Sequence, residues 1–319
     1  MRVLVTGASG FVGSRTCAHL ELAGHEVIRV LHSRPSGQKN GYRLDITDAA
    51  AFDRLNSVGE IDAIVHCAGI AHRFGRVSRE EFWRVNVEGA RNVAEYAVRN
   101  GVCRFVHISS VLVYGVPTSN HPVTEYQTPN PEDDYSCSKL AGERAVAEVC
   151  TAEGVKLTIL RPVPIIGEGS RGNVARLIRA IDRKHFLWIG DGRNERSFVY
   201  MDDVAGAILA SLSMQDGKST LNVTGGTITV RELVETISEC LGASHPARLL
   251  PHKPAQLAVS VSRPFARVPM IGRYHRTLET WLADAVYSGD ALTSLGFSPS
   301  VDLREGLRRE VDFYLASKR

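Results

Sequence analysis

The chain has 319 residues, of which 44% are hydrophobic, and its formal charge at neutral pH is +3. This length allows a large buried core, either in one domain or in two that pack closely. The basic residues are scattered rather than clustered, which argues against a nucleic-acid-binding protein. The longest apolar stretch, at residues 204–212, is far shorter than the roughly 20 residues of a membrane-spanning helix. We therefore expect a globular protein that binds neither nucleic acid nor membrane.

The N-terminal residues and the cysteines indicate a compartment. Strand-forming residues and glycines follow Met1 and Arg2 directly, without the long apolar core of a signal peptide. The six cysteines contain no CxxC pair, and this distribution is typical of free thiols rather than of a disulfide framework or a zinc site. We expect a cytoplasmic protein without a bound metal.

In chain order, short β-rich runs alternate with segments of helical spacing. Strands are expected at residues 3–5, 27–31, 63–65, 105–108 and 157–160, and helices at residues 12–22, 82–98 and 139–149. Such alternation predicts βαβ units and a parallel sheet. The expected fold class is therefore α/β, a Rossmann-type doubly wound parallel sheet with a smaller mixed α/β substrate lobe.

The sequence pattern changes after Arg161-Pro162. Proline, glycine and arginine become frequent up to Gly192, and isolated short strands such as residues 221–223 then alternate with helices. No Gly/Ser linker separates the two halves. We assign residues 1–162 and 196–221 to a dinucleotide-binding domain and residues 163–195 and 222–319 to a substrate-binding lobe, which closes with an amphipathic helix at about residues 301–314.

Three glycines follow the first strand at a spacing of three residues: Gly7, Gly10 and Gly13. A strand, a glycine turn and then a helix place backbone amides and a helix N-terminus where they can receive a pyrophosphate. A Cβ at these positions would block the phosphates or the packing of helix on strand. A tight turn without a ligand is the alternative, but the position at the first βα junction favours dinucleotide binding.

The end of the second expected strand indicates which dinucleotide. An acidic residue about 20 residues after the glycines would accept the 2′-hydroxyl of NAD. Here the strand ends at His32, Ser33 and Arg34, and Glu26 lies at its start. His32, Arg34 and Arg15 offer positive charge that suits a 2′-phosphate. We therefore place NADP ahead of NAD as the cofactor.

A second motif combines Ser110, at the end of a strand, with Tyr135 and Lys139. Residues four apart share one face of a helix, so the phenol and the ammonium are neighbours. A tyrosine with a pKa of about 10 needs a shift of about 3 units to act near neutral pH, and a cation about 4 Å away supplies roughly that much. Ser110 is placed to hydrogen-bond a substrate oxygen. The three residues predict hydride and proton transfer at a carbinol or carbonyl carbon.

The order of these motifs resembles an extended short-chain dehydrogenase/reductase of the NAD-dependent epimerase/dehydratase group. The matching segments are "TGASGFVG" (6–13), Asp45-Ile46, "HCAG" (66–69), "NVEGARN" (86–92), "ISSVLVYG" (108–115), Tyr135 with Lys139, "RPVPIIG" (161–167) and "RSFVYMDDVA" (196–205). The resemblance implies that Ser110, Tyr135 and Lys139 are catalytic and that the chain forms a homodimer through helices near 82–99 and 134–150. It also implies that Asp45 and Ile46 border the adenine, that Ala68 lines the cofactor and that Asn86 sits near it, although Asn86 could equally be a helix cap. With the residues inferred above, the expected cofactor site comprises Gly7, Ser9, Gly10, Phe11, Val12, Gly13, His32, Arg34, Asp45, Ile46, Ala68, Asn86, Tyr135 and Lys139.

Departures from the family pattern narrow the reaction. Sugar-nucleotide 4,6-dehydratases of this group carry an Asp-Glu pair after the catalytic hydroxyl, and here Val111 and Leu112 stand there. Hydride transfer at C4 of a nucleotide sugar remains. We rank a UDP-4-keto-6-deoxy-hexosamine 4-reductase of surface polysaccharide biosynthesis first. A UDP-sugar 4-epimerase with tightly bound NAD, a reductase of a non-sugar ketone of the steroid or flavonoid type and a non-catalytic NAD(P)-sensing regulator are the alternatives.

The substrate contacts are expected to come from the second half of the chain. The resemblance implies that Asn173 and Arg196 contact the nucleotide of the substrate. Ser110 is expected to contact the sugar. Arg273 or Arg276 adds charge, and His72 and Arg73 border the pocket or lie on a solvated loop. Pro164 replaces an asparagine that touches the substrate in many members of the family, so the identity of the sugar stays open.

Overall fold

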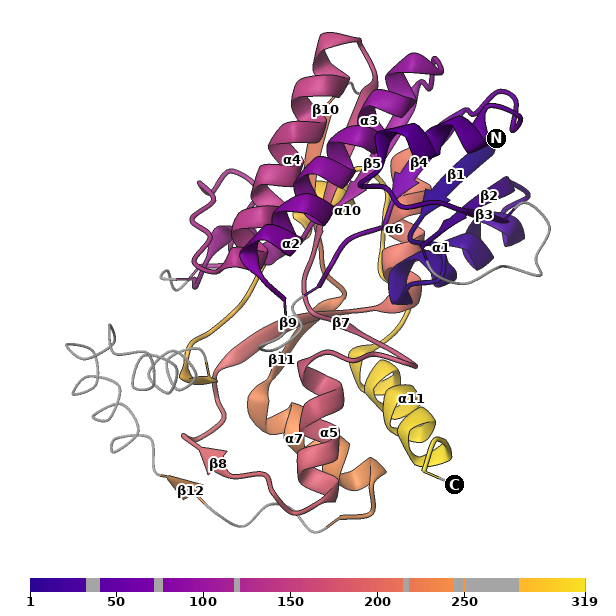
Figure 1. Ribbon diagram of the computed structural model, residues 1–319. Coiled ribbons are helices and arrows are strands. Elements are labelled where there is room, and N and C mark those ends of the chain that lie inside the picture. Colours follow the sequence, from indigo (N-terminus) through magenta and orange to yellow (C-terminus); the bar gives the residue numbers. More distant parts are fainter. Residues whose placement is uncertain are drawn as a thin grey trace.

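Seven parallel strands form the central layer of the protein (Figure 1). A computed structural model describes residues 1–32, 41–71, 77–117, 121–214, 218–243, 249–250 and 281–318. The strand order is β10-β6-β5-β4-β1-β2-β3. The bounds are β1 (Arg2–Thr6), β2 (Glu26–Leu31), β3 (Gly41–Arg43), β4 (Ala63–His66), β5 (Arg104–Ile108), β6 (Lys156–Pro162) and β10 (Lys218–Val223). The predicted Rossmann-type fold is confirmed.

The chain reverses its direction of travel across the sheet between β1 and β4. It runs outward from β1 to β2 and β3, and it then returns to place β4 on the other side of β1. In open α/β sheets this switch point opens a crevice at the carboxyl ends of the strands, where ligands bind. The sequence motifs at Gly7 and residues 66–69 follow these two strands directly.

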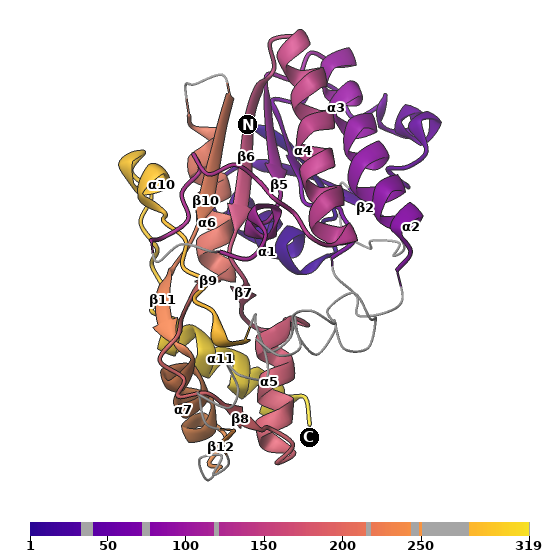
Figure 2. The ribbon, with the colours of Figure 1, turned by 90° about the vertical axis from the view of Figure 1, so that its left-hand side faces the viewer.

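Helices cover both faces of the sheet (Figures 1 and 2). Val3 and Val5 pack toward the helices α1 (Phe11–Leu22) and α6 (Met201–Leu212), whereas Leu4 faces the side of α3 (Gly89–Arg99) and α4 (Asp134–Ala152). All three side chains are fully buried, and each such burial contributes roughly 1.5–3 kcal/mol. Two-sided burial explains why this strand is a continuous apolar run rather than an alternating one.

The segment predicted as one helix at residues 82–98 is three consecutive pieces. These are α2 (Arg79–Trp83), one π-helical turn η2 (Arg84–Glu88) and α3. Single π turns inside helices occur often at functional sites. Two 3₁₀ turns complete this half, η1 (Ala49–Leu55) and η3 (Val111–Tyr114).

A smaller lobe lies beyond the carboxyl ends of the central strands (Figure 1). The three-stranded sheet β11-β9-β7 and the two-stranded sheet β12-β8 belong to it, and residues such as Ile166, Tyr200, Leu233 and Leu307 form its apolar core. The bounds are β7 (Ile165–Ile166), β8 (Trp188–Ile189), β9 (Glu195–Tyr200), β11 (Gly226–Thr229), β12 (Leu249–Leu250), α5 (Asn173–Asp182), α7 (Val230–Cys240) and α11 (Leu303–Ala316). A short helix, α10 (Asp290–Ser294), packs beside β10. The domain boundaries given above remain a prediction.

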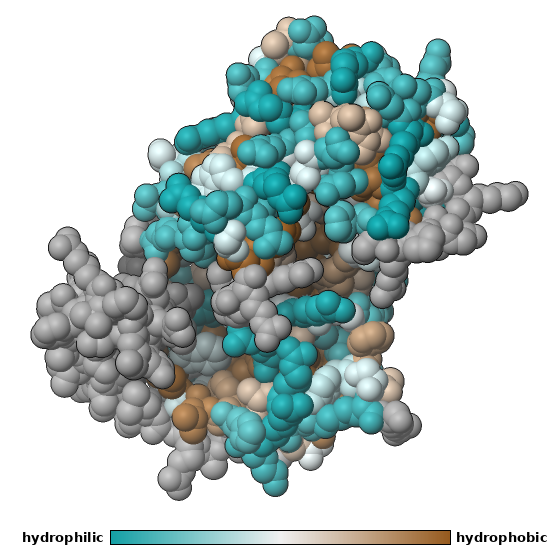
Figure 3. Space-filling view, in the orientation of Figure 1, coloured by the Kyte–Doolittle hydropathy of each residue, from teal (hydrophilic) through white to brown (hydrophobic). Residues whose placement is uncertain are grey.

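Hydrophilic side chains dominate the face of the molecule seen in Figure 3, with apolar residues in small patches. Within the described part of the chain, every helix is too short or too polar to cross a lipid bilayer.

The glycine turn gives a test of the packing between β1 and α1. A Cβ added to Gly13 would lie 2.2 Å from the carbonyl oxygen of Gly7, so Gly13→Ala forces the backbone apart. We expect the variant to lose about 1–3 kcal/mol of unfolding free energy in urea denaturation. The matched control is Gly172→Ala, where φ is −75° and the added Cβ would meet Ser170 Oγ at 3.5 Å. The control should change the free energy by less than about 0.5 kcal/mol; equal values for the two variants would contradict the argument.

Candidate active site

The glycine turn after β1 packs backbone against backbone on the segment after β4. Gly7 has a φ of +66°, and a Cβ there would lie 2.7 Å from the amide nitrogen of Ala68. The amide of Gly10 donates to the carbonyl of Gly7 at 2.8 Å, and α1 begins at Phe11 with no acidic residue in its first turn. An uncompensated helix N-terminus beside exposed glycine backbone is suited to an anion. The turn therefore fits the pyrophosphate of a dinucleotide.

The other predicted residues of the turn lie at its edge. Ser9 is exposed at the tip, and Phe11 and Val12 are half-buried in the first turn of α1. Ala68 donates its amide to Thr6 Oγ1 at 3.3 Å, which fixes the segment after β4 to the end of β1. These residues follow β1 and β4 at the switch point of the sheet.

Asp45 and Ile46 follow β3, at the carboxyl end of the parallel strands where the glycine turn also lies. Asp45 Oδ1 accepts hydrogen bonds from the amide and the hydroxyl of Thr47, at 2.9 and 2.8 Å. Burial acts against the charge of Asp45, but these bonds and the neighbouring His32 outweigh it, so the pKa of the carboxyl lies below its ordinary value. Ile46 is buried, and its carbonyl accepts from Asn92 of α3 at 2.9 Å.

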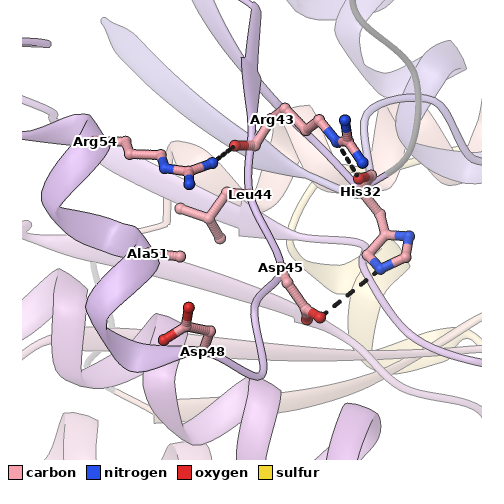
Figure 4. A pocket seen from close by; sticks show the side chains of 7 residues that line it. All are labelled: His32, Arg43, Leu44, Asp45, Asp48, Ala51 and Arg54. Atoms are coloured by element: carbon pink, nitrogen blue, oxygen red, sulfur yellow. Dashed lines mark hydrogen bonds and ion pairs between the residues drawn. The ribbon is translucent and has the colours of Figure 1, made fainter.

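His32 stands beside Asp45 in a pocket of about 390 Å³ (Figure 4). Its Nε2 lies 3.8 Å from Asp45 Oδ2. The pocket is lined by His32, Arg43, Leu44, Asp45, Asp48, Ala51 and Arg54, so both signs of charge are present. Arg34, the other residue predicted for this end of the cofactor, lies outside the described residues.

Arg15 is expected to offer positive charge to the cofactor, but it is not among the residues that line this pocket. Its guanidinium pairs with the carboxylate of Asp202 on α6, which also lies 3.2 Å from His19 Nε2. The spacing of Arg15 from the glycines suggested a cofactor contact, but the ion pair commits the side chain to the α1–α6 interface.

Asn86 joins the segment after β4 to the helix α4. It lies in the π turn η2, where its Oδ1 accepts from the Ile70 amide at 2.8 Å and its Nδ2 donates to the Ile70 carbonyl at 3.1 Å. The same Nδ2 donates to Ser138 of α4 at 2.9 Å. A Cβ on Gly142 would lie 2.3 Å from the Asn86 carbonyl oxygen, so η2 and α4 also touch through their backbones. Asn86 is therefore a bridge between two segments and not a helix cap.

Ser110, Tyr135 and Lys139 converge at the carboxyl end of β5. A capping box at Asp133, whose side chain accepts from the Ser136 amide at 2.7 Å, fixes the start of α4 and with it Tyr135 in the first turn. Lys139 Nζ, which is buried, donates to the Ile108 carbonyl at 2.6 Å. Ser110 caps η3 and shares a hydrogen bond with the Tyr135 side chain.

Burial disfavours the charged form of both titratable groups. Burial raises the pKa of Tyr135 to about 12, although the hydrogen bond with Ser110 acts in the opposite direction. Burial lowers the pKa of Lys139 to about 8, against the attraction of Glu143 and Cys67. Burial and the neighbouring Asp133 leave the pKa of Tyr135 above its ordinary value, so the expected shift toward neutral pH through Lys139 is not found. A further positive charge beside the phenol would lower its pKa.

Besides Ser110, two predicted substrate residues lie on elements of the smaller sheet and the helix near it, Arg196 on β9 and Asn173 on α5. Asn173 is the exposed first residue of α5, and Arg196 on β9 donates to the Trp281 carbonyl at 3.2 Å. Burial lowers the pKa of Arg196. The carbonyl of Pro164 accepts from the Val199 amide at 3.2 Å and so links β7 to β9. The four remaining predicted residues, His72, Arg73, Arg273 and Arg276, lie outside the described part of the chain.

A buried ion pair between Arg161 of β6 and Glu143 of α4 is not predicted from the sequence. A charged residue inside an otherwise apolar strand was the available signal, because a buried arginine requires a partner. Among the described residues, no group of three His, Cys, Asp or Glu side chains is arranged to hold a metal ion.

The sequence model of a known family matches residues 3–224, from β1 to the end of β10. The chain belongs to the NAD dependent epimerase/dehydratase family. UDP-glucose 4-epimerase of Mycolicibacterium smegmatis is 30% identical, with 98% of each chain covered. The 2-alkyl-3-oxoalkanoate reductase of Stenotrophomonas maltophilia is 29% identical over 97% of this chain and 98% of the relative.

Solved structures agree with this family membership. The structure of MoeE5 in complex with UDP-glucose and NAD is similar with a TM-score of 0.78, at 27% identity and with the whole of both chains covered. The glycine turn at the switch point of this chain is of the type that a dinucleotide requires, and the family is NAD dependent.

The buried ammonium of Lys139 predicts a pH dependence of stability. Its folded pKa of about 8 lies below the ordinary value of 10.5, so between these values the unfolded chain binds more protons and stability rises with pH. Relative to Lys139→Met, the wild-type chain should gain about 1–2 kcal/mol of unfolding free energy between about pH 7.5 and about pH 9.5. Urea denaturation at both pH values measures it. Lys156→Met, at the partly exposed start of β6, is the control, and an equal gain against that control would contradict the assignment.

Proposed function

We propose that this chain moves a hydride between a nicotinamide cofactor and C4 of a nucleotide-activated sugar, and that it acts as a 4-epimerase. The observation that carries the proposal is the convergence of Ser110, Tyr135 and Lys139 at the end of β5, beside the glycine turn at the switch point. The name of the epimerase relative and the UDP-glucose and NAD bound by MoeE5 support it.

Each of the three residues has one task in this proposal. Tyr135 exchanges a proton with the oxygen on C4, because its hydroxyl is the titratable group at the site that can act as both acid and base. Ser110 hydrogen-bonds the same oxygen while its charge changes. Lys139 supplies positive charge from the buried end of the site, where it is held by the Ile108 carbonyl.

When bound, an oxidised nicotinamide supplies a hydride acceptor and a positive charge. Burial raises the pKa of Tyr135 to about 12, and a positive charge beside the phenol would lower it. Such a charge would favour the form of Tyr135 that accepts a proton from the substrate.

The residues after Ser110 limit the chemistry. Val111 and Leu112 have apolar side chains, so neither provides a second acid or base at the position where dehydratases need one. Elimination of water requires such a pair, whereas hydride transfer with one proton does not. The site therefore favours an epimerase or a reductase over a dehydratase.

A 4-ketoreductase that uses NADP is the second candidate, because β2 ends at Leu31 and His32 follows where NAD-binding chains carry an acid. A ketone other than a sugar would use the same three residues, as the name of the Stenotrophomonas relative indicates. A non-catalytic sensor is disfavoured because it has no need of the three residues together.

Cofactor extraction and calorimetry separate these candidates. We expect NAD to copurify with the protein and to be retained on dialysis, and UDP to bind in titration calorimetry. Exchangeable NADPH in place of retained NAD would overturn the epimerase in favour of the reductase. Absence of UDP binding would exclude a UDP-sugar as the substrate.

Removal of the phenol tests the mechanism. Tyr135→Phe should lower kcat for interconversion of UDP-glucose and UDP-galactose by about 10²–10⁴-fold, because proton transfer is lost, while UDP affinity stays within about threefold. Tyr126→Phe, at a side chain that is 97% exposed, is the matched control and should be neutral. Unchanged turnover in Tyr135→Phe would falsify the assignment.

A further inference from the structure

A buried guanidinium lies directly behind the candidate active site. Arg161 Nε and Nη2 donate to the two carboxylate oxygens of Glu143, at 2.9 and 2.6 Å, and the side chains are 7% and 4% exposed. The remaining Nη1 donates to the hydroxyl of Tyr114 at 2.8 Å, and the guanidinium carbon lies 4.8 Å from the centre of that ring. All three nitrogens of Arg161 are thus engaged.

The two partners of Arg161 belong to the two segments that carry the proposed catalytic groups. Glu143 lies on α4 one turn after Lys139. Tyr114 is the last residue of η3, the turn that Ser110 begins by accepting a hydrogen bond from the Leu112 amide at 3.2 Å. One side chain therefore bonds the helix of Tyr135 and Lys139 to the turn of Ser110.

The far side of Tyr114 is anchored to the edge of the sheet. Its hydroxyl donates to Asn222 Oδ1 of β10 at 3.0 Å, and the backbone N–H of Asn222 donates to Glu125 Oε1 at 2.7 Å. Asn222 Nδ2 donates to the Val123 carbonyl at 3.2 Å. Hydrogen bonds to Arg161 of β6 and to Asn222 of β10 therefore hold the Tyr114 side chain, and with it the end of η3, in place.

Stability alone is a poor reason for such a pair. Burying two charges costs much of what their attraction returns, and apolar replacements of buried pairs are often neutral. A bidentate pair instead fixes distance and orientation. Its placement between α4 and η3 points to a geometric role.

The structure assigns Glu143, Arg161 and Tyr114 as positioning residues that hold Ser110 in register with Tyr135 and Lys139. The assignment rests on the proposed function of those three residues. None of the positioning residues is expected to touch the substrate, since each is engaged with the others behind the site.

Glu143 has a second effect, on the charge of Lys139. The other titratable neighbours of Lys139 are Tyr135 on α4, Cys67 and His66 at the end of β4, and His107 on β5. Burial raises the pKa of Tyr135 and of Cys67 to about 12, and it lowers that of His66 to about 3 and that of His107 well below its usual range. These four groups are neutral near pH 7, so among the named neighbours Glu143 alone carries a negative charge that favours the ammonium.

Two variants separate the two effects, and Glu148→Gln is the matched control. Glu148 lies on the same helix, is 70% exposed and pairs with Arg91 at the surface. The Lys139 amine is titrated by NMR in unliganded protein with isotope-labelled lysine, and its signal is assigned with Lys139→Met. Melting curves report folding, and kcat and KM are measured with NAD and UDP-glucose.

Glu143→Gln should lower the midpoint of the Lys139 titration by about one pH unit, because a buried negative charge is lost. It should also lower kcat by about 10-fold or more with KM within about threefold. Tyr114→Phe removes one hydroxyl from η3, so it should lower kcat by about 10-fold and leave the Lys139 titration unmoved. Glu148→Gln should change neither quantity.

The assignment is overturned if folded Glu143→Gln leaves the Lys139 titration in place, or if Tyr114→Phe keeps wild-type kcat and KM. Should Glu143→Gln fail to fold, Tyr114→Phe decides. Failure of the proposed function gives a different result, since Tyr135→Phe would then keep its turnover. The NMR titration in unliganded protein is independent of substrate and would still measure the effect of Glu143 on Lys139.

Discussion

The parallel register of β1, β4 and β5 is the constraint on which the site depends. Thr6 pairs with His66, and His66 pairs with His107, so the three strands end level with one another. The glycine turn, the segment at Ala68 and the Ser110 turn therefore leave the sheet at one height. A slip of one residue in any pair would turn alternate side chains to the opposite face and separate the glycine turn from the turn of Ser110.

Close backbone contacts then fix the helices on this row of strand ends. Gly7 against Ala68, and Gly142 against the Asn86 carbonyl, are contacts that any side chain would prevent. They bring α4 near enough for Lys139 to reach the Ile108 carbonyl. Glycine is required here by proximity, and the π turn at η2 presents Asn86 to both neighbouring segments.

The parts of the site that the sequence could predict are local in the chain. Gly7, Gly10 and Gly13 form one turn, and Tyr135 and Lys139 share one helical face, so spacing alone places them. The partners of Asn86 and the bond of Lys139 to Ile108 join segments far apart in sequence, and no local pattern encodes them. The raised pKa of Tyr135 likewise follows from burial, which depends on the whole fold and not on a local pattern. Substrate contacts in the smaller lobe stay a prediction.

The strand β10 has a consequence for how the protein is made. The sequence pattern predicts an isolated short strand here, yet β10 completes the main sheet by pairing with β6 along Leu157–Pro162. The elements β7, α5, β8 and β9 of the smaller lobe lie between β6 and β10 in the sequence. Until it emerges from the ribosome, the nascent nucleotide-binding layer has β6 as an open edge with unpaired amides and carbonyls. The same asparagine that anchors Tyr114, Asn222, arrives with that strand. Pairing of the β6 edge and anchoring of Tyr114 therefore both wait for synthesis of the same strand.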